Sequence, residues 1–517
     1  MTTVATTCPY CGVGCGVQAR VAPGADVEIK GDADHPANLG RLCSKGSALA
    51  ETIWMEDRLR SPRIGGADAG WDEALQLVAD RLADTIAEHG PDSVAFYVSG
   101  QLLTEDYYIA NKLMKGFIGS GNIDTNSRLC MASSVAGHKR AFGTDTVPGL
   151  YTDLEEADLV VLVGSNLAWC HPVLYQRLAA AKAARPELKV VTIDPRRTAT
   201  ADLADMHLGL APGTDVALFN GLLEHLHVSA EVDSDYVANH VTGFDAALEA
   251  ACSDDPCVTG LSLEELDAFY SLWAGTQKVV TVYSQGVNQS STGTDKVNAI
   301  LNCHLATGRI GKPGMGPFSV TGQPNAMGGR EVGGLANMLA CHLDIENAAH
   351  RDAVRTFWDA PHLTETPGLK AVDMFRAVAD GRIKAIWIAH TNPVVSMPEA
   401  DAVKAALEAC DFVVVSDITA ATDTADGLCP RLRLRHPRRD LPRTRGAVGR
   451  RGPVRQGFRH LGHVGHHRQR IRHAETHPLA RDRDPHRRAL LRRRSVLHAQ
   501  RQGADAAAPQ PSPRRHA

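Results

Sequence analysis

The sequence predicts a multidomain α/β fold with mostly parallel sheets, preceded by a small cysteine-rich domain. Short apolar runs rich in β-branched residues alternate with helix-like segments, which is typical of buried parallel strands joined by helices. The 517-residue chain is longer than one ordinary domain, so several packed cores are expected. Hydrophobic and charged contents of 44% and 22% are ordinary for a globular protein.

The individual elements follow from periodicity. Residues 72–89 have apolar side chains at helical spacing, and Gly90 is expected to end that helix. Further helices are expected at Val216–Leu226 and Ala402–Ala409. The predicted buried strands are Val160–Val163, Val190–Ile193, Val279–Val282, Ala385–Ile388 and Phe412–Val415.

Four cysteines near the N-terminus predict a metal centre. Cys8, Cys11 and Cys15 lie in C-P-Y-C-G-V-G-C, and Cys43 follows after a long gap. Three closely spaced thiolates and a distant fourth can each bind one iron of a [4Fe–4S] cluster. The intervening glycines allow the backbone to approach such a cluster closely. A zinc site and a disulfide pair are the alternatives, although zinc sites usually contain two C-x2-C pairs.

Polar loops follow two of the predicted strands, where open α/β sheets bind ligands. Gly164-Ser165-Asn166 can offer backbone N–H groups to phosphate oxygens. Asp194 could accept hydrogen bonds from a ribose or a guanine edge, and Arg196 and Arg197 could pair with phosphate. Each loop taken alone is equally compatible with an ordinary capped turn.

Two further segments are notable, a loop before a predicted helix and a glycine-rich run. In Ala211–Asp215, Thr214 or Asp215 is expected to be an ordinary helix N-cap. Thr321–Gly334 has neither a helical nor a strand period, and it combines several glycines with polar side chains. Such a segment suggests a ligand or a close backbone approach. Its polar and sulfur-containing side chains are Gln323, Asn325, Met327, Arg330 and Glu331.

Cys130 stands alone between Leu129 and Met131, and its spacing by itself favours a small core residue. The other cysteines have no ligand spacing and are interpreted as structural thiols: Cys170, Cys252, Cys257, Cys303, Cys341, Cys410 and Cys429.

Charge is distributed very unevenly along the chain. Residues 431–517 contain 24 arginines, no lysine and 5 acidic residues, whereas residues 1–430 contain 31 basic and 54 acidic ones. The tail has no hydrophobic period and no aromatic interleaving for nucleic-acid stacking. Its composition favours GC-rich codons translated out of frame from near Asp426–Pro430. A disordered basic tail and a nucleic-acid-binding arm are the alternatives.

No stretch approaches 18 uninterrupted apolar residues, so no membrane partner is expected. No basic, apolar leader precedes Cys8. We therefore expect a cytoplasmic protein. Because the basic tail has no aromatic interleaving, we expect no nucleic-acid partner.

Taken together, these segments resemble the molybdopterin oxidoreductase family, and within it the cytoplasmic, assimilatory nitrate reductases of bacteria. The N-terminal cysteines are similar to that family's [4Fe–4S] domain, and Gln101–Gly143, which includes N-S-R-L-C-M, is similar almost throughout. The resemblance covers roughly residues 5–427. It implies that Cys130 is a thiolate ligand of molybdenum and that Lys45 bridges the cluster and the pterin.

The resemblance also implies a molybdenum bis(molybdopterin guanine dinucleotide) cofactor. The residues that match the family's dinucleotide contacts are Gly164, Ser165, Asn166, His171, Asp194, Thr214, Asp215, Gly322, Gln323 and Met327, within a segment that extends to Glu331.

The implied reaction is the two-electron reduction of nitrate to nitrite, with Arg330 as a candidate for attracting the anion. No second cluster motif is visible, so an external donor is expected: a ferredoxin, a flavodoxin or an NADH-linked reductase subunit. Formate dehydrogenase on the same scaffold is the nearest alternative, but there His typically follows the metal-ligating residue, and here Met131 does. An inactive or purely electron-transferring iron–sulfur protein is the other alternative.

The family resemblance predicts three regions. Residues 1–60 would form the cluster domain, residues 61–427 the pterin-binding α/β domains, and residues 428–517 a disordered, out-of-frame tail. Asp417–Asp426 begins the family's pattern and the sequence then departs from it. The family's C-terminal barrel domain is thus expected to be missing, which would weaken enclosure of the cofactor.

Overall fold

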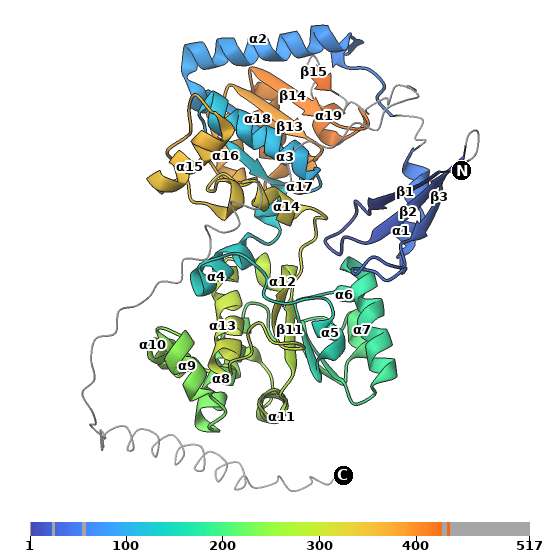
Figure 1. Ribbon diagram of the computed structural model, residues 1–517. Coiled ribbons are helices and arrows are strands. Elements are labelled where there is room, and N and C mark those ends of the chain that lie inside the picture. Colours follow the sequence, from blue (N-terminus) through green and yellow to red (C-terminus); the bar gives the residue numbers. More distant parts are fainter. Residues whose placement is uncertain (1, 23–25, 54–57, 427–431, 435–517) are drawn as a thin grey trace, which may run out of the picture. The chain divides into compact units, whose positions relative to one another are not determined.

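The computed structural model describes residues 2–22, 26–53, 58–426 and 432–434 (Figure 1). These residues all belong to one compact unit, Met1–Arg443. Among them, no helix combines the length and apolarity that crossing a bilayer requires. The predicted tail falls outside the described residues apart from Leu432–Leu434, and these three residues form strand β15 rather than the expected disorder.

The N-terminal sheet has three antiparallel strands, β1 (Thr2–Thr7), β2 (Gly16–Val21) and β3 (Glu28–Gly31). The connection between β1 and β2 holds the first three cysteines of the N-terminal group. A one-turn helix, α1 (Ser44–Ser47), begins directly after Cys43. The sheet therefore brings Cys8, Cys11 and Cys15 into one tight loop.

A five-stranded parallel sheet follows, in the order β10-β9-β8-β11-β12. The three strands predicted in this region are confirmed to within one residue. The bounds are β8 (Leu159–Val163), β9 (Lys189–Ile193), β10 (Met206–Leu208), β11 (Val279–Tyr283) and β12 (Gly316–Ser319). Helices α8 (Asp215–Val228), α11 (Leu263–Gly275) and α13 (Gly293–Ala306) share an apolar core with one face, and α7 (Pro172–Ala184) packs on the other.

The second large sheet has the order β5-β4-β15-β14-β13-β6-β7 and is parallel from β15 to β7. Two of its strands were predicted and are confirmed. The bounds are β4 (Arg63–Ile64), β5 (Ala67–Asp68), β6 (Val94–Val98), β7 (Ile123–Thr125), β13 (Ala385–Ala389), β14 (Phe412–Ser416) and β15 (Leu432–Leu434).

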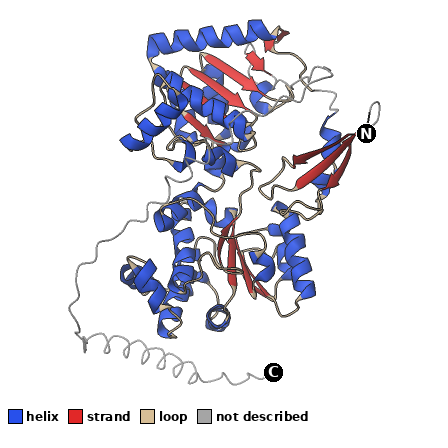
Figure 2. Ribbon diagram, viewed as in Figure 1, coloured by secondary structure: helices blue, strands red, loops and turns tan. Residues whose placement is uncertain are grey.

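Successive residues of β6 point to opposite faces of this sheet, as the strand period of two requires. Ala95 and Tyr97 pack in one core with α16 (Ala371–Ala379) and α18 (Ala400–Ala409). Phe96 and Val98 pack in another with α2 (Trp71–His89). Because both faces are covered by helices (Figure 2), every residue of β6 is buried, and the strand has an uninterrupted apolar sequence.

The remaining helices connect these layers, and one of them corrects a prediction. The segment Thr321–Gly334 was expected to be irregular, but Ala326–Glu331 forms α14. The helices predicted at 72–89, Val216–Leu226 and Ala402–Ala409 are confirmed as α2, α8 and α18. The other α-helices of the described residues are α3 (Thr104–Asn111), α4 (Ala132–Phe142), α5 (Asp153–Glu156), α6 (Leu167–Cys170), α9 (Ser234–His240), α10 (Phe244–Ala251), α12 (Gln285–Asn288), α15 (Ala348–Trp358), α17 (Pro393–Ser396) and α19 (Asp423–Asp426).

Candidate functional site

The five-stranded sheet has a topological switch point between β8 and β11. The chain proceeds from β8 through β9 to β10 on one side and then returns to place β11 on the other. Gly164 follows β8 and Gly286 follows β11, and the N–H of Gly286 donates to the carbonyl of Gly164 over 3.0 Å. Open α/β sheets bind ligands in the crevice at such a point. The predicted Gly164–Asn166 turn lies at this crevice.

The seven-stranded sheet has its own switch point, between β6 and β13. Gly100 follows β6, and its N–H donates to Oδ1 of Asn126 over 2.8 Å. The side-chain amide of Asn126 also donates to the hydroxyl of Thr391, which follows β13, over 3.2 Å. The turn that contains Asn126 is therefore fastened to the second switch point.

Cys130 lies at the end of this turn and contacts the first switch point as well. The turn is the 3-10 helix η4 (Asn126–Leu129). Cys130 is only 6% exposed, and its Sγ atom accepts a hydrogen bond of 2.8 Å from Nε2 of Gln285, the first residue of the one-turn helix α12 that follows β11. The loops at the carboxyl ends of the two sheets thus meet at this thiol.

The surroundings of Cys130 differ from those of an ordinary core cysteine. Cys303 and Cys410 lie within apolar clusters of buried residues. Cys130 instead has an amide donor and the hydroxyl of Thr321, whose Oγ1 atom lies 4.0 Å from Sγ. Gly322 is so close that a Cβ atom there would lie 3.5 Å from the sulfur. Cys130 therefore has polar side chains beside its sulfur at the meeting point of the two sheets, which apolar packing alone would not require.

Thr321 connects this thiol with the cysteine loop. A Cβ atom on Gly12, between Cys11 and Cys15, would lie 2.3 Å from the carbonyl oxygen of Thr321. The same carbonyl lies 2.6 Å from Nε2 of His171. Thr321 therefore contacts all three features: the cysteine loop, His171 and Cys130.

The four N-terminal cysteines converge without forming a disulfide. The N–H of Cys8 donates to the carbonyl of Cys15 over 2.9 Å, which closes the loop. Burial, together with the smaller effects of the neighbouring Cys11, Cys8 and Cys43, raises the pKa of Cys15 to about 12. The four cysteines are therefore close enough to affect one another electrostatically. Such a set fits a cluster in which each thiolate binds a different iron.

No three His, Cys, Asp or Glu side chains of the described residues are grouped closely enough to share one metal ion. A cubane spaces its four sulfur ligands more widely than a single ion does, because each of its irons takes one thiolate.

Lys45, in α1, lies within electrostatic range of Cys8, Cys11 and His171. Burial is the main cause that raises the pKa values of Cys8 and Cys11 and lowers the pKa of His171. The Lys45 ammonium acts electrostatically on all three groups. The structure therefore places a cation near both the N-terminal cysteines and His171, whose ring contacts the carbonyl of Thr321.

Two buried polar atoms near the first switch point have no hydrogen-bond partner, the hydroxyl of Ser165 and Nδ1 of His171. Buried polar groups are normally satisfied, so unpaired ones at a crevice indicate a ligand. Asn166 is already used, because its Oδ1 accepts from the hydroxyl of Thr200 over 2.9 Å. These atoms fit a polar group such as a dinucleotide in the crevice.

Asp194 and the loop before α8 lie at the same edge, because β8, β9 and β10 are neighbours. Oδ1 of Asp194 accepts from the backbone N–H of Arg196 over 2.8 Å, and the side chains of Arg196 and Arg197 are exposed. The predicted N-cap is wrong in its chemistry. Thr214 occupies the cap position but donates to the carbonyl of Ala211.

Asp215, the other candidate for that cap, pairs with Lys296 over 2.6 Å, and both side chains are buried. The helix start is therefore held by an ion pair to α13 rather than by a side-chain cap.

Arg330 is buried in α14 and forms an ion pair of 3.3 Å with Asp145. Asp145 also pairs with Nδ1 of His342 over 2.6 Å, and Nε2 of the same ring lies 3.2 Å from Glu331. The two carboxylates raise the pKa of His342 to about 9. The predicted anion-attracting arginine is thus part of a four-residue charge cluster. The rest of segment 321–331 includes Met327, which is exposed, and Gln323, which accepts from the hydroxyl of Thr321 over 3.3 Å.

Sequence reasoning missed Gln285, Gly286, Gly100 and Asn126. The signal for the first pair was present in Y-S-Q-G-V-N-Q, a polar, glycine-containing loop directly after a predicted strand. Of the other cysteines interpreted as structural thiols, Cys170 and Cys257 are exposed, whereas Cys303 and Cys410 are buried. Cys429 lies outside the described residues.

Comparison with known families gives two matches. Residues 58–427 match the family described as molybdopterin oxidoreductase, and residues 1–54 match the molybdopterin oxidoreductase Fe4S4 domain. Together these matches leave few of the residues before position 428 unassigned.

Individual proteins show the same relationship. The chain is 55% identical over 428 residues to a nitrate reductase of Klebsiella oxytoca, covering 82% of this chain and 49% of that protein. A nitrate reductase of Shewanella frigidimarina is 52% identical over 440 residues, covering 82% and 47%. The chain thus spans about half the length of these relatives. The structure of acetylene hydratase from Pelobacter acetylenicus shares the fold, with a TM-score of 0.65, 20% identity and coverage of 83% and 62%.

Proposed function

The chain belongs to the molybdopterin oxidoreductase family, and from that membership we propose that it reduces nitrate to nitrite. The observation that carries the proposal is the position of Cys130, a buried thiol at the meeting point of two switch points. Relatives that are 52–55% identical across this region are nitrate reductases. We assign residues 1–60 to the cluster domain and 61–427 to the pterin-binding domains.

The fold supports a cofactor with two nucleotide-bearing halves. Each of the two sheets has a crevice at its switch point. The crevice of the seven-stranded sheet borders the turn that ends at Cys130, and that of the five-stranded sheet borders Gln285, whose amide contacts the sulfur. Two such crevices suit two dinucleotides that share one metal between them. We therefore propose the bis(molybdopterin guanine dinucleotide) form, with Ser165, His171 and Asp194 among its contacts.

The reaction consumes two electrons and two protons per nitrate, breaks one N–O bond, and yields nitrite and water. Molybdenum held by dithiolenes and a thiolate supplies oxygen-atom and electron transfer when it is bound. Cys130 would be its protein ligand, held by the amide of Gln285.

The protein's own residues set the charge around the anion. Arg330 is a buried cation in the segment that also borders Cys130, and its partner Asp145 keeps it in place. Backbone dipoles of the same segment add to the field that an anionic substrate meets.

Electrons would enter through the four cysteines and pass Lys45. The short separation between the cysteine loop, Thr321 and Cys130 supports this route. An external donor, such as a ferredoxin, a flavodoxin or an NADH-linked reductase subunit, would supply them. We place the protein in the cytoplasm, where scattered cysteines stay reduced.

The test is a measurement of metals and activity on the same purified sample. We expect iron and molybdenum in the chain and nitrite formation with a reduced viologen dye as donor. Cys130→Ala should abolish nitrite formation and retain iron, whereas Cys170→Ala, an exposed thiol in α6, should leave both unchanged. Nitrite formation at the wild-type rate by Cys130→Ala would contradict the proposal.

The same assay separates the alternatives. Formate oxidation without nitrate reduction would identify a formate dehydrogenase, and iron without molybdenum an electron carrier. We also propose that residues after Asp426 are translated out of frame. Sequencing the gene across that position tests this, and an intact reading frame there would contradict it.

A further inference from the structure

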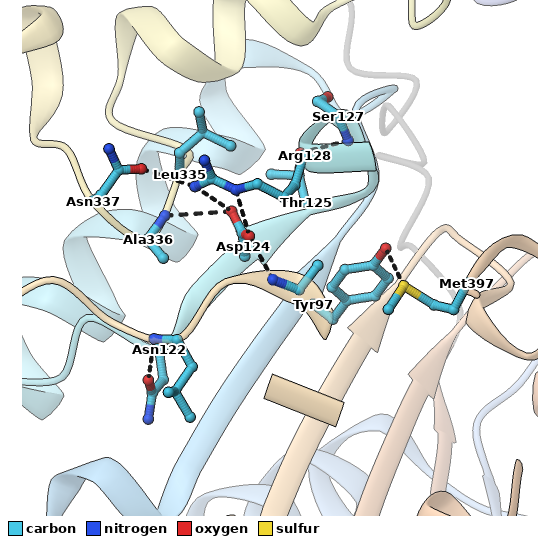
Figure 3. Close-up of polar contacts among 12 residues, drawn as sticks. Tyr97, Asn122, Asp124, Thr125, Ser127, Arg128, Leu335, Ala336, Asn337 and Met397 are labelled. Carbon is cyan, nitrogen blue, oxygen red and sulfur yellow. Dashed lines mark hydrogen bonds and ion pairs between the residues drawn. The ribbon is translucent and has the colours of Figure 1, made fainter. Parts of the chain in front are cut away.

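A buried carboxylate, Asp124 in β7, lies at the centre of a polar network just before Cys130 (Figure 3). It accepts two hydrogen bonds from the guanidinium of Arg128, of 3.0 and 3.2 Å. It also accepts from the backbone N–H groups of Ala371 over 2.8 Å and Ala336 over 3.4 Å. One side chain therefore connects η4 with two segments more than 200 residues away.

The same network holds the segment 333–338 from its other side. Arg128 donates to Oδ1 of Asn337 over 2.8 Å. The ammonium of Lys115, which is fully buried, donates to the carbonyls of Gly333, Leu335 and Met338. Three carbonyls directed at one ammonium fix the path of this segment.

The two segments that contact Cys130 are each joined to one of these residues, Asp124 or Lys115. On one side, η4 (Asn126–Leu129) joins Thr125 to Cys130, and the N–H of Cys130 donates to the carbonyl of Ser127 over 3.1 Å. On the other side, the segment 321–331, with Thr321 and Gly322 beside the sulfur, leads directly into 333–338.

Burying an ammonium and a carboxylate costs free energy that apolar residues of similar volume would not. A fully satisfied polar network of this kind specifies one geometry. We propose that Asp124, acting through Arg128, and Lys115, acting through the segment 333–338, are positioning residues that hold the Cys130 thiol between the two switch points. Their importance to catalysis rests on the proposed function, but the position of the thiol does not.

The experiment measures the reactivity of each cysteine in the full chain before metal is loaded. Wild type, Asp124→Asn and Lys115→Met are treated with iodoacetamide, and alkylation is followed peptide by peptide. Because local opening exposes a buried thiol, we expect Cys130 to react about tenfold faster in both variants. Two cysteines serve as internal references: Cys303, which is fully buried in the core of the five-stranded sheet, and Cys170, which is exposed. Their alkylation rates should not change.

Arg309→Met is the matched control. Arg309 is also a buried cation that donates to backbone carbonyls, including that of Thr276 over 2.6 Å. It lies shortly before β12 of the five-stranded sheet, outside the network of Asp124 and Lys115. It should lower thermal stability without accelerating alkylation of Cys130. Equal acceleration in Arg309→Met would mean general loosening and would overturn the proposal.

A milder variant covers the case in which the charge variants do not fold. Asn337→Ala removes one acceptor of Arg128, and we expect Cys130 to react about two- to threefold faster. An unchanged Cys130 rate in the folded variants overturns the positioning role. Absence of molybdenum or of nitrite formation in the wild type would overturn the proposed function, and the alkylation result would still decide the positioning role.

Discussion

The side-chain amide of Gln285 donates a hydrogen bond of 2.8 Å to the sulfur of Cys130. The two residues are 155 positions apart and come from loops at the carboxyl ends of different sheets. A hydrogen bond of this kind contributes about 0.5–1.5 kcal/mol, and it holds the sulfur of Cys130, the proposed molybdenum ligand, in one position.

Replacing Gln285 by Leu is therefore expected to lower the molybdenum content about tenfold under limiting molybdenum, with iron content unchanged. Gln289→Leu is the matched control, since Gln289 lies in the same loop and donates to the carbonyl of Leu129 over 2.7 Å. Metal analysis of the purified variants is the measurement. Equal molybdenum loss in the two variants would show that anchoring of the turn, and not the sulfur contact, matters.

The contact between Gly164 and Gly286 is expected to tolerate no side chain. Gly164 has a φ of +51°, and a Cβ atom there would lie 2.7 Å from the Cα atom of Gly286. Gly164→Ala should lower the free energy of unfolding by about 2–4 kcal/mol, because backbone strain and overpacking add. Gly260→Ala, at a φ of +74° with no atom within 4 Å, should cost only about 1–2 kcal/mol. Urea denaturation checks both values, and similar losses would contradict the crowding argument.

Stability is expected to fall with rising pH because of His342. Its pKa in the folded chain is raised to about 9, above the value of about 6.5 in an unfolded chain. The stabilisation by Asp145 and Glu331 is thus complete below pH 6.5 and is lost as pH rises through 9. With the ring 26% exposed, we expect the change to be about 2 kcal/mol.

The comparison is between wild type and His342→Gln, by urea denaturation at pH 6 and pH 9.5. The variant should be less stable than wild type at pH 6 and about equally stable at pH 9.5. A constant difference between the two proteins across this range would show that His342 does not titrate as described.

Cluster assembly is expected to depend on Cys15 and on pH. Burial and the neighbouring thiols raise the pKa of Cys15 to about 12, and thiols must lose their protons to bind iron. Iron uptake by the metal-free chain should therefore increase from pH 6 to pH 9. Cys15→Ser should lower bound iron and the visible absorption of the cluster at every pH, whereas Cys170→Ser should not. Undiminished iron in Cys15→Ser would remove this residue from the ligand set.

Five strands of the two large sheets were predicted, because helices cover both faces of those sheets and such strands are apolar throughout. Val160–Val163 and Phe412–Val415 are apolar throughout, and both lie in buried strands. Strand β1 was not predicted, since every one of its residues is exposed and it is held only by pairing with β2. The helix within Thr321–Gly334 was also missed, because it is short and rich in glycine.

The residues of the site likewise fall into those that local sequence predicts and those that it does not. Local spacing was enough to predict the cysteine loop, since Cys8, Cys11 and Cys15 are close along the chain and a tight turn suffices to gather them. It was also enough to predict which loops follow buried strands, because strand periodicity is local. It could not predict that Gln285, Thr321 and Gly322 meet at Cys130 or that Arg330 pairs with Asp145, which the tertiary fold sets. These contacts depend on which strands are neighbours in each sheet, and the free energy that selects neighbours comes from burial across the whole core rather than from any local spacing.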